Sequence, residues 1–294
     1  MCSSDLIENF IPPNSLLIFN KSKVQKVRII DEKSTGGKIE FFVLEILSKY
    51  TAKCLIKSTD KKTTGKKYFF SSFNVEIINV YPEFFEVKFS ENILNLIENI
   101  GKVPLPPYIK DESRKYKYYN NQFSNNGFSV ASPTAGLHFT NTTIEKLKKS
   151  GHEIVFINLD VNLGTFKPIT TKYIEDHKIH SEKYNISEKD FLKILNYKKL
   201  NKNILCIGTT SLRAIESAFI NNQLEGETDL FILPNTKLNL ANQLITNFHA
   251  PKSSLLSIVH NIYGNKWREL YEFALNKKMK FLSFGDAVLF DINE

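Results

Sequence analysis

Histidines beside small or hydroxyl-bearing residues are the first candidates for chemistry in this chain. His138 lies within residues 132–140, Ser-Pro-Thr-Ala-Gly-Leu-His-Phe-Thr, close to Thr134 and Gly136. Small residues let the backbone approach a ligand closely, and histidine is the usual side chain for proton transfer near neutral pH. The alternative is that His138 caps or packs against the helix that follows. The segment therefore predicts either a substrate-binding loop with a proton-transfer residue or a structural turn.

A second group of titratable residues follows a short loop that begins with Gly164 and Thr165. His177 and His180 can share one face of a helix at i, i+3 spacing and bind a metal ion there. Matching third and fourth ligands are missing from the sequence, so hydrogen bonding is favoured over a metal site. Glu182 is then expected to orient a histidine or to act as a base.

The segment 208–216, Gly-Thr-Thr-Ser-Leu-Arg-Ala-Ile-Glu, joins an apolar strand to a helix. Thr209 and Thr210 are expected in the first helical turn, where free backbone N–H groups favour an anion or a carboxylate. Arg213 and Glu216 are expected on a separate face, either as ligand-binding residues or as an i, i+3 ion pair of little energetic weight. The buried face is expected to contain Leu212, Ile215 and Phe219.

Two more polar turns stand next to predicted strands. Asn247, His249 and Lys252 lie where a strand passes into a helix, and Pro251 is expected in the first helical turn. The carboxyl ends of strands are where α/β sheets bind ligands, so this turn predicts a binding site. Asp286 follows a glycine just before the last predicted strand, either as a functional carboxylate or as part of an ordinary turn.

The pattern of apolar residues predicts the elements that position these groups. Up to about residue 105, short β-prone runs follow one another closely with one helix at 91–100, which is typical of a small barrel or curled sheet. From about residue 130, helical and strand patterns alternate, as in a parallel or mixed sheet. Helices are expected to begin at a capping box at Thr142 and at Ser187. Strands are expected at 153–161, 203–207, 229–233, 244–248 and 287–290.

Bulk composition narrows the class of protein. A chain of 294 residues with 42% hydrophobic and 24% charged residues has an ordinary globular composition. It shows neither an apolar run of about 18 residues nor a signal-peptide pattern, so a cytosolic protein is expected. Cys2, Cys54 and Cys206 have neither disulfide nor zinc spacing, and Cys206 is expected to be a small buried hydrophobe. The sequence contains no P-loop and no G-x-G-x-x-G fingerprint, which argues against an NTPase and a Rossmann dehydrogenase.

The charge balance suits a polyanionic partner without identifying it. Lys and Arg number 39 against 31 Asp and Glu, and the net charge of +8 suits RNA because these side chains displace counterions from phosphates. The abundance of Lys, Asn and Ile also fits an A+T-rich genome, which would make the charge incidental. One basic turn, which can face RNA or simply be solvated, contains Lys61, Lys62, Lys66 and Lys67.

Together, the polar segments resemble the S-adenosylmethionine:tRNA ribosyltransferase-isomerase family of queuosine biosynthesis. They occur in the family's order and cover nearly the whole chain. The matching strings are Pro133-Thr-Ala-Gly-Leu-His-Phe139, Gly164-Thr-Phe166 with His177-x-x-His180-Ser-Glu182, Gly208-Thr-Thr-Ser211 with Arg213 and Glu216, Leu244-Ile-Thr-Asn-Phe-His249 with Pro251-Lys-Ser253, and Gly285-Asp286-Ala287. Weaker matches are Gly36-Gly-Lys-Ile-Glu40 and Leu105-Pro-Pro-Tyr-Ile109.

The resemblance implies an α/β catalytic domain, residues 1–25 and 106–294, interrupted by a smaller β-barrel-like insertion at 26–105. It implies transfer of the ribosyl part of S-adenosylmethionine to the aminomethyl group of 7-aminomethyl-7-deazaguanine in tRNA. The sugar is rearranged to give epoxyqueuosine-tRNA, and adenine and methionine leave. S-adenosylmethionine is then a substrate and tRNA the partner, so neither a cofactor nor a metal is expected. A cytoplasmic protein is expected, and a monomer is favoured although the oligomeric state is left open.

The resemblance also suggests roles for individual residues. A sulfonium acidifies the adjacent ribose 5′ carbon, so the reaction needs a base there and a proton donor for the leaving adenine. The proton-transfer candidates are His138, His177, His180 and His249, with Glu182 and Asp286 to orient them or bind sugar hydroxyls. The candidates for the methionine carboxylate are Thr209, Thr210 and Arg213. Further substrate contacts are expected from Thr134, Gly136, Gly164, Thr165, Glu216, Asn247 and Lys252.

Three departures from the family pattern stand beside these matches. The family normally begins with several tens of residues that include an Arg-Asp-x-Ser-Arg type segment, whereas the match here starts near Leu6, as expected of a shortened chain. The family's Asn-Asp-Thr-Arg-Val is Asn20-Lys-Ser-Lys-Val24 here, and its His-Val-Gly is Asp160-Val-Asn162. The missing segment and the change at Asp160 motivate one alternative, a degenerate paralogue that binds tRNA or S-adenosylmethionine without catalysis. A second alternative is a different S-adenosylmethionine-dependent enzyme such as a methyltransferase.

Overall fold

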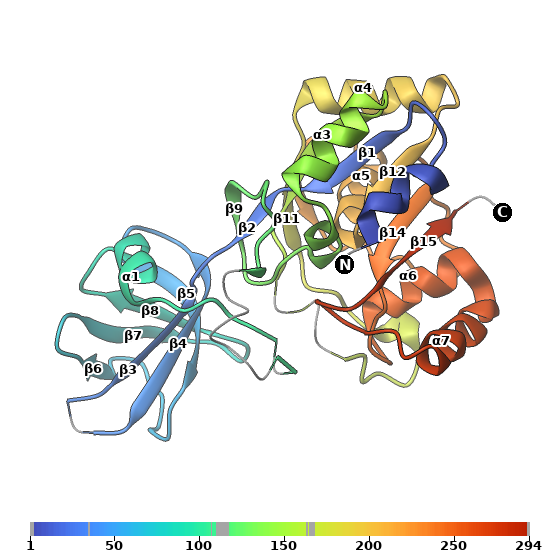
Figure 1. Cartoon of the computed structure of the whole chain (residues 1–294). Helices are drawn as coiled ribbons and strands as arrows, with labels where there is room; N and C mark the ends of the chain where they lie inside the picture. Colours follow the sequence, from blue (N-terminus) through green and yellow to red (C-terminus); the bar gives the residue numbers. More distant parts are fainter. Residues whose placement is uncertain are drawn as a thin grey trace. The chain divides into compact units, whose positions relative to one another are not determined.

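The structure, a computed structural model, describes residues 3–34, 36–106, 108–109, 118–162, 164 and 168–292. It contains two compact units, one formed by Met1–Lys23 with Ser113–Glu294 and the other by Val24–Glu112. The second unit is therefore an insertion in the chain of the first (Figure 1). The boundaries at 26 and 105 expected from the sequence lie close to these breaks. Among the described residues, no helix has both the length and the apolar character that a membrane crossing requires.

The first unit is built on a seven-stranded mixed sheet. The strand order is β13-β11-β10-β1-β12-β14-β15, with parallel pairing among β10, β1, β12 and β14 and antiparallel pairing on either side. The central strands are short buried apolar runs, as expected for a parallel sheet covered on both faces. The strands are β1 (Leu16–Asn20), β10 (Glu153–Leu159), β11 (Glu182–Asn185), β12 (Ile204–Ile207), β13 (Glu225–Thr228), β14 (Gln243–Asn247) and β15 (Ala287–Asp291).

Alternate residues of the central strand β1 belong to two separate cores. Leu16 and Ile18 pack with residues of α4, α5 and α6, whereas Leu17 and Phe19 pack with α3 and the 3-10 turns η1 and η3. This alternation follows from the two-residue period of a strand whose sheet is covered on both faces. The elements, most of them labelled in Figure 1, are η1 (Ser3–Phe10), η3 (Thr134–His138), α3 (Asn141–Lys149), α4 (Glu188–Lys199), α5 (Thr209–Asn221), α6 (Ser254–Tyr263) and α7 (Trp267–Asn276).

Two of the expected helix starts are wrong, because a nearby hydroxyl caps the helix at another position. The helix expected at Thr142 begins after Thr140, whose side chain accepts a hydrogen bond from the Thr143 N–H at 3.1 Å. Pro251 is not in the first turn of α6, since Ser253 is the cap and accepts from the Leu256 N–H at 3.2 Å. The predicted cap at Ser187 is confirmed, with the Asp190 N–H as its donor.

Two expectations about strands and buried faces are also wrong. The strand expected at 229–233 lies earlier, at Glu225–Thr228, where it pairs with β11. Phe219 is 43% exposed and does not belong to the buried face of α5. That face is instead very wide, because the whole run from Thr209 to Ala218 is buried. A helix next to five strands buries polar as well as apolar positions, which a single apolar stripe does not predict.

The second unit is a curled antiparallel sheet. Its strands follow the order β3-β4-β5-β8-β7-β6. Phe41 of β4 contacts Tyr68 of the edge strand β6, with ring centroids 5.8 Å apart, and the Ser34 N–H donates to the Phe69 carbonyl at 3.1 Å. Distant strands of the order thus approach each other, which confirms the predicted barrel-like insertion. The elements are β3 (Arg28–Glu32), β4 (Lys38–Ile46), β5 (Thr51–Lys57), β6 (Lys67–Phe69), β7 (Asn74–Val80), β8 (Phe85–Phe89) and α1 (Ile93–Ile100).

Candidate functional site

The carboxyl ends of the parallel strands bring many candidate residues to one edge of the sheet in the first unit. β12 ends just before Gly208, and β14 ends at Asn247. β11 and β15 run in the opposite direction, so Glu182 at the start of β11 and Asp286 just before β15 lie at the same edge. Open α/β sheets bind their ligands outside this edge. The topology therefore gathers residues that are far apart in the sequence.

Asn247 joins three segments at this edge. Its Oδ1 accepts a hydrogen bond from Thr134 Oγ1 at 2.8 Å. Its Nδ2 lies 3.1 Å from His138 Nε2 and 3.4 Å from the carbonyl oxygen of Gly285. Asn247 is only 3% exposed, so these protein groups replace water as its partners. The predicted residues Thr134, His138 and Asn247 therefore form one hydrogen-bonded cluster, with Asp286 next to Gly285 in the chain.

His138 is half-buried, and the carboxylate of Asp286 influences its pKa. Burial lowers the pKa of His138 below its ordinary value, and the charge of Asp286 opposes that shift. Asp286 is exposed, and its Oδ2 accepts a hydrogen bond from the Lys280 N–H at 2.7 Å. Asp286 thus closes an ordinary turn and also acts electrostatically on His138, and a functional role for this carboxylate stays a prediction.

The first turn of α5 lies beside η3. Gly208 has φ 90° and ψ 152°, which residues with a Cβ rarely adopt, and a Cβ there would lie 3.4 Å from the Ala135 Cβ. Thr209 and Thr210 follow, and both are buried. Thr210 Oγ1 has no hydrogen-bond partner among the residues that the structure describes. The first-turn N–H groups and this hydroxyl together form a place rich in hydrogen-bond donors, which suits an anionic acceptor.

Arg213 and Glu182 form a buried ion pair. Arg213 Nη1 donates to Glu182 Oε2, and their side chains are 4% and 1% exposed. Arg213 Nε donates to the Leu230 carbonyl at 3.0 Å, and Glu182 Oε1 accepts from the Asn162 N–H at 2.8 Å. The alternative of an ion pair between Arg213 and Glu216 is therefore wrong, because the partner of Arg213 comes from the neighbouring strand β11.

Glu216 is held by backbone groups instead. Its carboxylate is fully buried and accepts hydrogen bonds from the N–H groups of Asn239, Leu240 and Ala241 at 2.7, 2.8 and 3.3 Å. Asn239 Nδ2 adds a fourth bond at 3.1 Å. Four donors satisfy a buried charge without a counterion. A substrate-binding role for Glu216 stays a prediction, since these contacts hold the segment that leads into β14.

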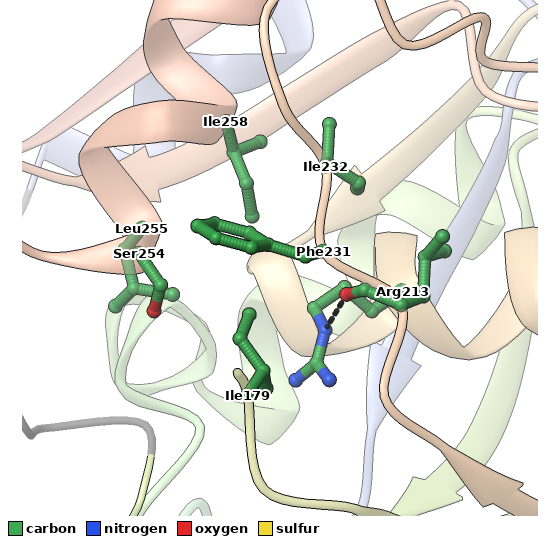
Figure 2. Close-up of a pocket in the computed structure, with 8 residues that line it drawn as sticks. Ile179, Arg213, Phe231, Ile232, Ser254, Leu255 and Ile258 are labelled. Atoms are coloured by element: carbon green, nitrogen blue, oxygen red, sulfur yellow. Dashed lines mark hydrogen bonds between the residues drawn. The ribbon is translucent and has the colours of Figure 1, made fainter. Parts of the chain in front are cut away.

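A pocket lies against the Arg213 guanidinium (Figure 2). Its cavity volume is about 10 Å³, which is room for roughly one water-sized group. Arg213 Nη2 is buried there and has no hydrogen-bond partner within the described part of the chain. A ligand atom that accepts a hydrogen bond would satisfy this nitrogen. The other lining residues are Ile179, Leu230, Phe231, Ile232, Ser254, Leu255 and Ile258.

His177 and His180 do not share a helix face, so the proposed geometry for metal binding is wrong. The short turn η5 (Ile174–Asp176) ends before His177, and the chain is not helical from there to Glu182. The His177 ring packs edge-on against Phe231, with centroids 5.8 Å apart. A Cβ at Gly164 would overlap the His180 ring, which explains the glycine. In the described ranges, no group of three or more His, Cys, Asp or Glu could hold a metal ion.

His249 lies in the interior behind the sheet edge. Its Nε2 is 2.9 Å from Thr246 Oγ1, and its backbone N–H donates to the Tyr271 hydroxyl at 3.0 Å. Burial lowers the pKa of His249 to about 4 and raises the pKa of Tyr271 to about 12, so both side chains are neutral at pH 7. Lys252, by contrast, is exposed, and its carbonyl accepts a hydrogen bond from the Ile169 N–H at 2.7 Å.

Two positions that depart from the family pattern contact each other. Asp160 Oδ1 accepts hydrogen bonds from Ser22 Oγ at 2.6 Å, from the Phe128 N–H at 3.0 Å and from Asn158 Nδ2 at 3.1 Å. Ser22 Oγ also lies 2.6 Å from Ser129 Oγ. The altered residues therefore form a connected polar group near the ends of β1 and β10.

Several residues beside the predicted ones were missed by sequence reasoning. Asn121 Nδ2 donates to the Pro133 carbonyl at 3.3 Å and would lie 2.7 Å from a Cβ at Gly136. Asn121 lies in a polar loop whose sequence contains no recognisable motif. The apolar residues of the pocket could not be distinguished in the sequence from those of a buried strand. Thr165 is the predicted site residue that lies outside the described residues.

The family model and the relatives that match this chain agree with one another. A family model described as "Queuosine biosynthesis protein" matches residues 3–290. The S-adenosylmethionine:tRNA ribosyltransferase-isomerase of Legionella pneumophila (strain Lens) is 37% identical over 290 residues, which cover 96% of this chain and 86% of that protein. The proteins of the same name from Clostridioides difficile (strain 630) and Vesicomyosocius okutanii are 36% and 38% identical, with 97% and 98% of this chain and 86% and 87% of those proteins covered.

One solved structure gives the same result. The crystal structure of the S-adenosylmethionine tRNA ribosyltransferase from Thermotoga maritima is 27% identical, has a TM-score of 0.50, and covers 97% of this chain and 85% of that one. The match of the family model runs through both units and spans every segment that contributes to the sheet-edge cluster. With its fold, its motifs and its relatives in agreement, the chain belongs to the family of queuosine biosynthesis proteins.

Proposed function

We propose that this protein is an S-adenosylmethionine:tRNA ribosyltransferase-isomerase. It transfers the ribosyl moiety of S-adenosylmethionine to 7-aminomethyl-7-deazaguanine in tRNA and isomerises it, giving epoxyqueuosine-tRNA and releasing adenine and methionine. The observation that carries the proposal is the 36–38% identity, over nearly the whole chain, to relatives named for this activity. We further propose that the protein is a cytoplasmic monomer that needs neither a cofactor nor a metal.

The chemistry sets three requirements for the site. A base must remove a proton from the ribose 5′ carbon next to the sulfonium, a donor must assist the leaving adenine, and the attacking amine must be neutral. His138 is the residue we place beside the reacting groups, because it stands at the sheet edge with Asn247 and Asp286. His249 supports this edge from the interior, where its contacts are to Thr246 and Tyr271.

The methionine carboxylate is placed at the start of α5. The free N–H groups of its first turn and the unpartnered Thr210 hydroxyl favour an anion there, next to Thr209. Arg213 contributes less than a free guanidinium would, since Glu182 already neutralises its charge. Two sets of proposed roles rest on the family resemblance alone: proton transfer by His177 and His180, and substrate contacts by Gly136, Gly164, Thr165, Glu216 and Lys252.

The tRNA is proposed to contact the basic turn of the second unit. Lys62 Nζ is occupied by the Ser58 carbonyl at 2.8 Å, and Lys67 Nζ lies 3.6 Å from a Glu76 carboxylate oxygen. Lys61 and Lys66 are both exposed, but Lys66 Nζ lies over the Tyr68 ring, 5.9 Å from its centroid, so we take Lys61 as the cation to test. One phosphate contact contributes about 0.9 to the slope of log Kd against log salt, so Lys61→Ala is expected to lower that slope by about this amount. An unchanged slope would remove Lys61 from the interface.

The function is tested with purified protein, S-adenosylmethionine and tRNA that contains 7-aminomethyl-7-deazaguanine. Free adenine is followed by chromatography, and the digested tRNA is searched for epoxyqueuosine by mass spectrometry. Equal amounts of both products are expected. Release of S-adenosylhomocysteine would indicate a methyltransferase, and tRNA binding without either product would indicate a non-catalytic binding protein; both outcomes contradict the proposal.

A further inference from the structure

The side-chain amide of Asn247 has neighbours that decide its orientation. One end lies 2.8 Å from the Thr134 hydroxyl, and the other end lies 3.4 Å from the Gly285 carbonyl oxygen. A carbonyl oxygen can only accept a hydrogen bond, whereas a hydroxyl can either donate or accept. The end next to Gly285 must therefore be the NH₂ group, because the opposite orientation would place two oxygens against each other.

The orientation of the Asn247 amide also determines which ring nitrogen of His138 carries the proton. The same NH₂ group lies 3.1 Å from His138 Nε2, so Nε2 must offer a lone pair to it. A neutral imidazole carries one proton, and an acceptor at Nε2 places that proton on Nδ1. A doubly protonated imidazole would turn two donors toward each other and lose this hydrogen bond.

We infer that Asn247 is a positioning residue that holds His138 as the neutral tautomer protonated on Nδ1. Nε2 is then occupied and cannot take a proton from substrate while this bond is kept. His138 therefore serves as a hydrogen-bond donor through Nδ1, and removal of the ribose 5′ proton is carried out by another group. Neutral histidines that act as donors in this way are a known catalytic device. The tautomer follows from the geometry alone, whereas the part that it plays in the reaction rests on the proposed function.

The charged surroundings agree with a neutral ring. Among the described residues, Asp286, from the turn before β15, is the carboxylate that acts on His138. The end of β14 presents the neutral side-chain amide of Asn247 to the ring. Burial lowers the pKa of His138, and the field of Asp286 opposes it. The net direction is toward the neutral form at pH 7.

The direct test is the ¹⁵N spectrum of the full-length protein labelled at histidine. The chain has six histidines, so the long-range ¹H–¹⁵N correlations of each ring can be separated. His138 is expected to show a protonated Nδ1 and an unprotonated Nε2 near pH 7. His152 is an internal reference of the opposite kind, because its Nδ1 accepts from the Ser15 N–H at 3.2 Å and its proton is therefore on Nε2.

Assignment of the signals does not depend on one variant. His138→Ala removes the His138 signal, and single replacement of each of the other five histidines identifies it by elimination if that variant does not fold. A His138 ring protonated on Nε2, or on both nitrogens near pH 7, overturns the inference. This result is obtained without any turnover measurement.

The second test reverses the hydrogen bond. In Asn247→Asp the carboxylate can only accept, so it draws the proton to Nε2 and raises the pKa of His138. The kcat for adenine release near pH 7 is expected to fall about tenfold or more, within the range that proton-transfer groups contribute, and its acidic limb to move to higher pH. Asn242→Asp, just before β14, is the matched control, because it keeps the oxygen that accepts from the Ile204 N–H at 3.0 Å.

The outcomes separate this inference from the proposed function. Wild-type kcat and an unshifted pH profile in Asn247→Asp would contradict the positioning role. Adenine release by a wild-type enzyme whose His138 is protonated on Nε2 would leave the function intact and overturn the inference. If the protein shows the expected tautomer but releases no adenine, the inference about the tautomer stands and the proposed function is contradicted.

Discussion

The two units bury different kinds of side chain. In Val24–Glu112 the buried side chains of the described residues are hydrophobic, whereas buried polar and charged side chains, such as Glu182, Arg213 and Asn247, occur in the first unit. A buried polar group costs free energy unless its hydrogen bonds are satisfied, so the first unit needs specific partners that the second does not. Buried polar contacts and simple apolar packing are thus divided between the units.

The largest expected effect lies in the polar cluster of the first unit. His138→Ala is expected to lower kcat for adenine release by about 100- to 1,000-fold, as for the loss of a preorganised donor. The unfolding midpoint in urea should stay close to that of the wild type, because His138 is only half-buried. His260→Gln on α6 is the control and should keep full activity. Full turnover by His138→Ala would mean that the cluster is structural, like the rest of the core.

Variants of the buried Glu182–Arg213 ion pair test how strongly the unfolding free energy of the first unit depends on its polar contacts. Glu182→Met leaves the Arg213 charge buried without its counterion, which is expected to cost about 3–5 kcal/mol of unfolding free energy. Trp267 is the only tryptophan and lies in this unit, so its fluorescence reports the relevant transition. The double variant Glu182→Met with Arg213→Met should recover a large part of the loss. Equal losses in the single and the double variants would contradict this account.

His249 makes the stability of the first unit depend on pH. Its folded pKa of about 4 lies below the ordinary 6.5, so the unfolded chain takes up the proton first. The stabilisation is complete above pH 6.5 and is lost as the pH falls toward 4. Between pH 8 and pH 5 the loss is about 2 kcal/mol. The measurement is Trp267 fluorescence in urea, with His249→Asn as reference; a variant with the same pH dependence as the wild type would rule out this contribution.

The smallest effect is expected in the apolar core of the second unit. Ile77 is fully buried in β7, and Ile77→Val removes one methyl group, which costs about 0.5–1.5 kcal/mol. Hydrogen exchange of amides in β7 and β8 measures the change, and adenine release should not alter. Val80→Ala is the control, because Val80 is 46% exposed. A fall in kcat for Ile77→Val would break the division of roles between the units.

Local patterns were sufficient to predict most elements of the fold. The β-prone runs before residue 105 and the alternating helices and strands after 130 gave a β-rich region joined to an α/β region, and the family resemblance implied that the β-rich region is a barrel-like insertion, as observed. The errors came from competition between equivalent signals. Thr140 and Thr142 are both possible caps, and only the structure decides between them. Leu230, Phe231 and Ile232 form an apolar run that lines a pocket and is not a strand.

The site was less predictable because its contacts join distant segments. The motifs pointed to Arg213 and Glu182, but their pairing depends on β11 lying beside α5 across 31 residues of sequence. The position of Asn247 between Thr134 and His138 depends in the same way on the place of η3 over β14. Periodicity describes one element at a time, so it cannot assign partners between elements.

Backbone N–H groups hold the Glu216 carboxylate in the way that an anion-binding loop holds its ligand. Consecutive backbone N–H groups at Asn239, Leu240 and Ala241 converge on one point, which is the arrangement that phosphate and sulfate sites use. Here the Glu216 carboxylate of the protein itself occupies that position. The loop is thereby closed to external anions, and the same side chain links α5 to the entrance of β14. In this chain Glu216 therefore satisfies the backbone N–H groups that an anionic ligand would otherwise bind.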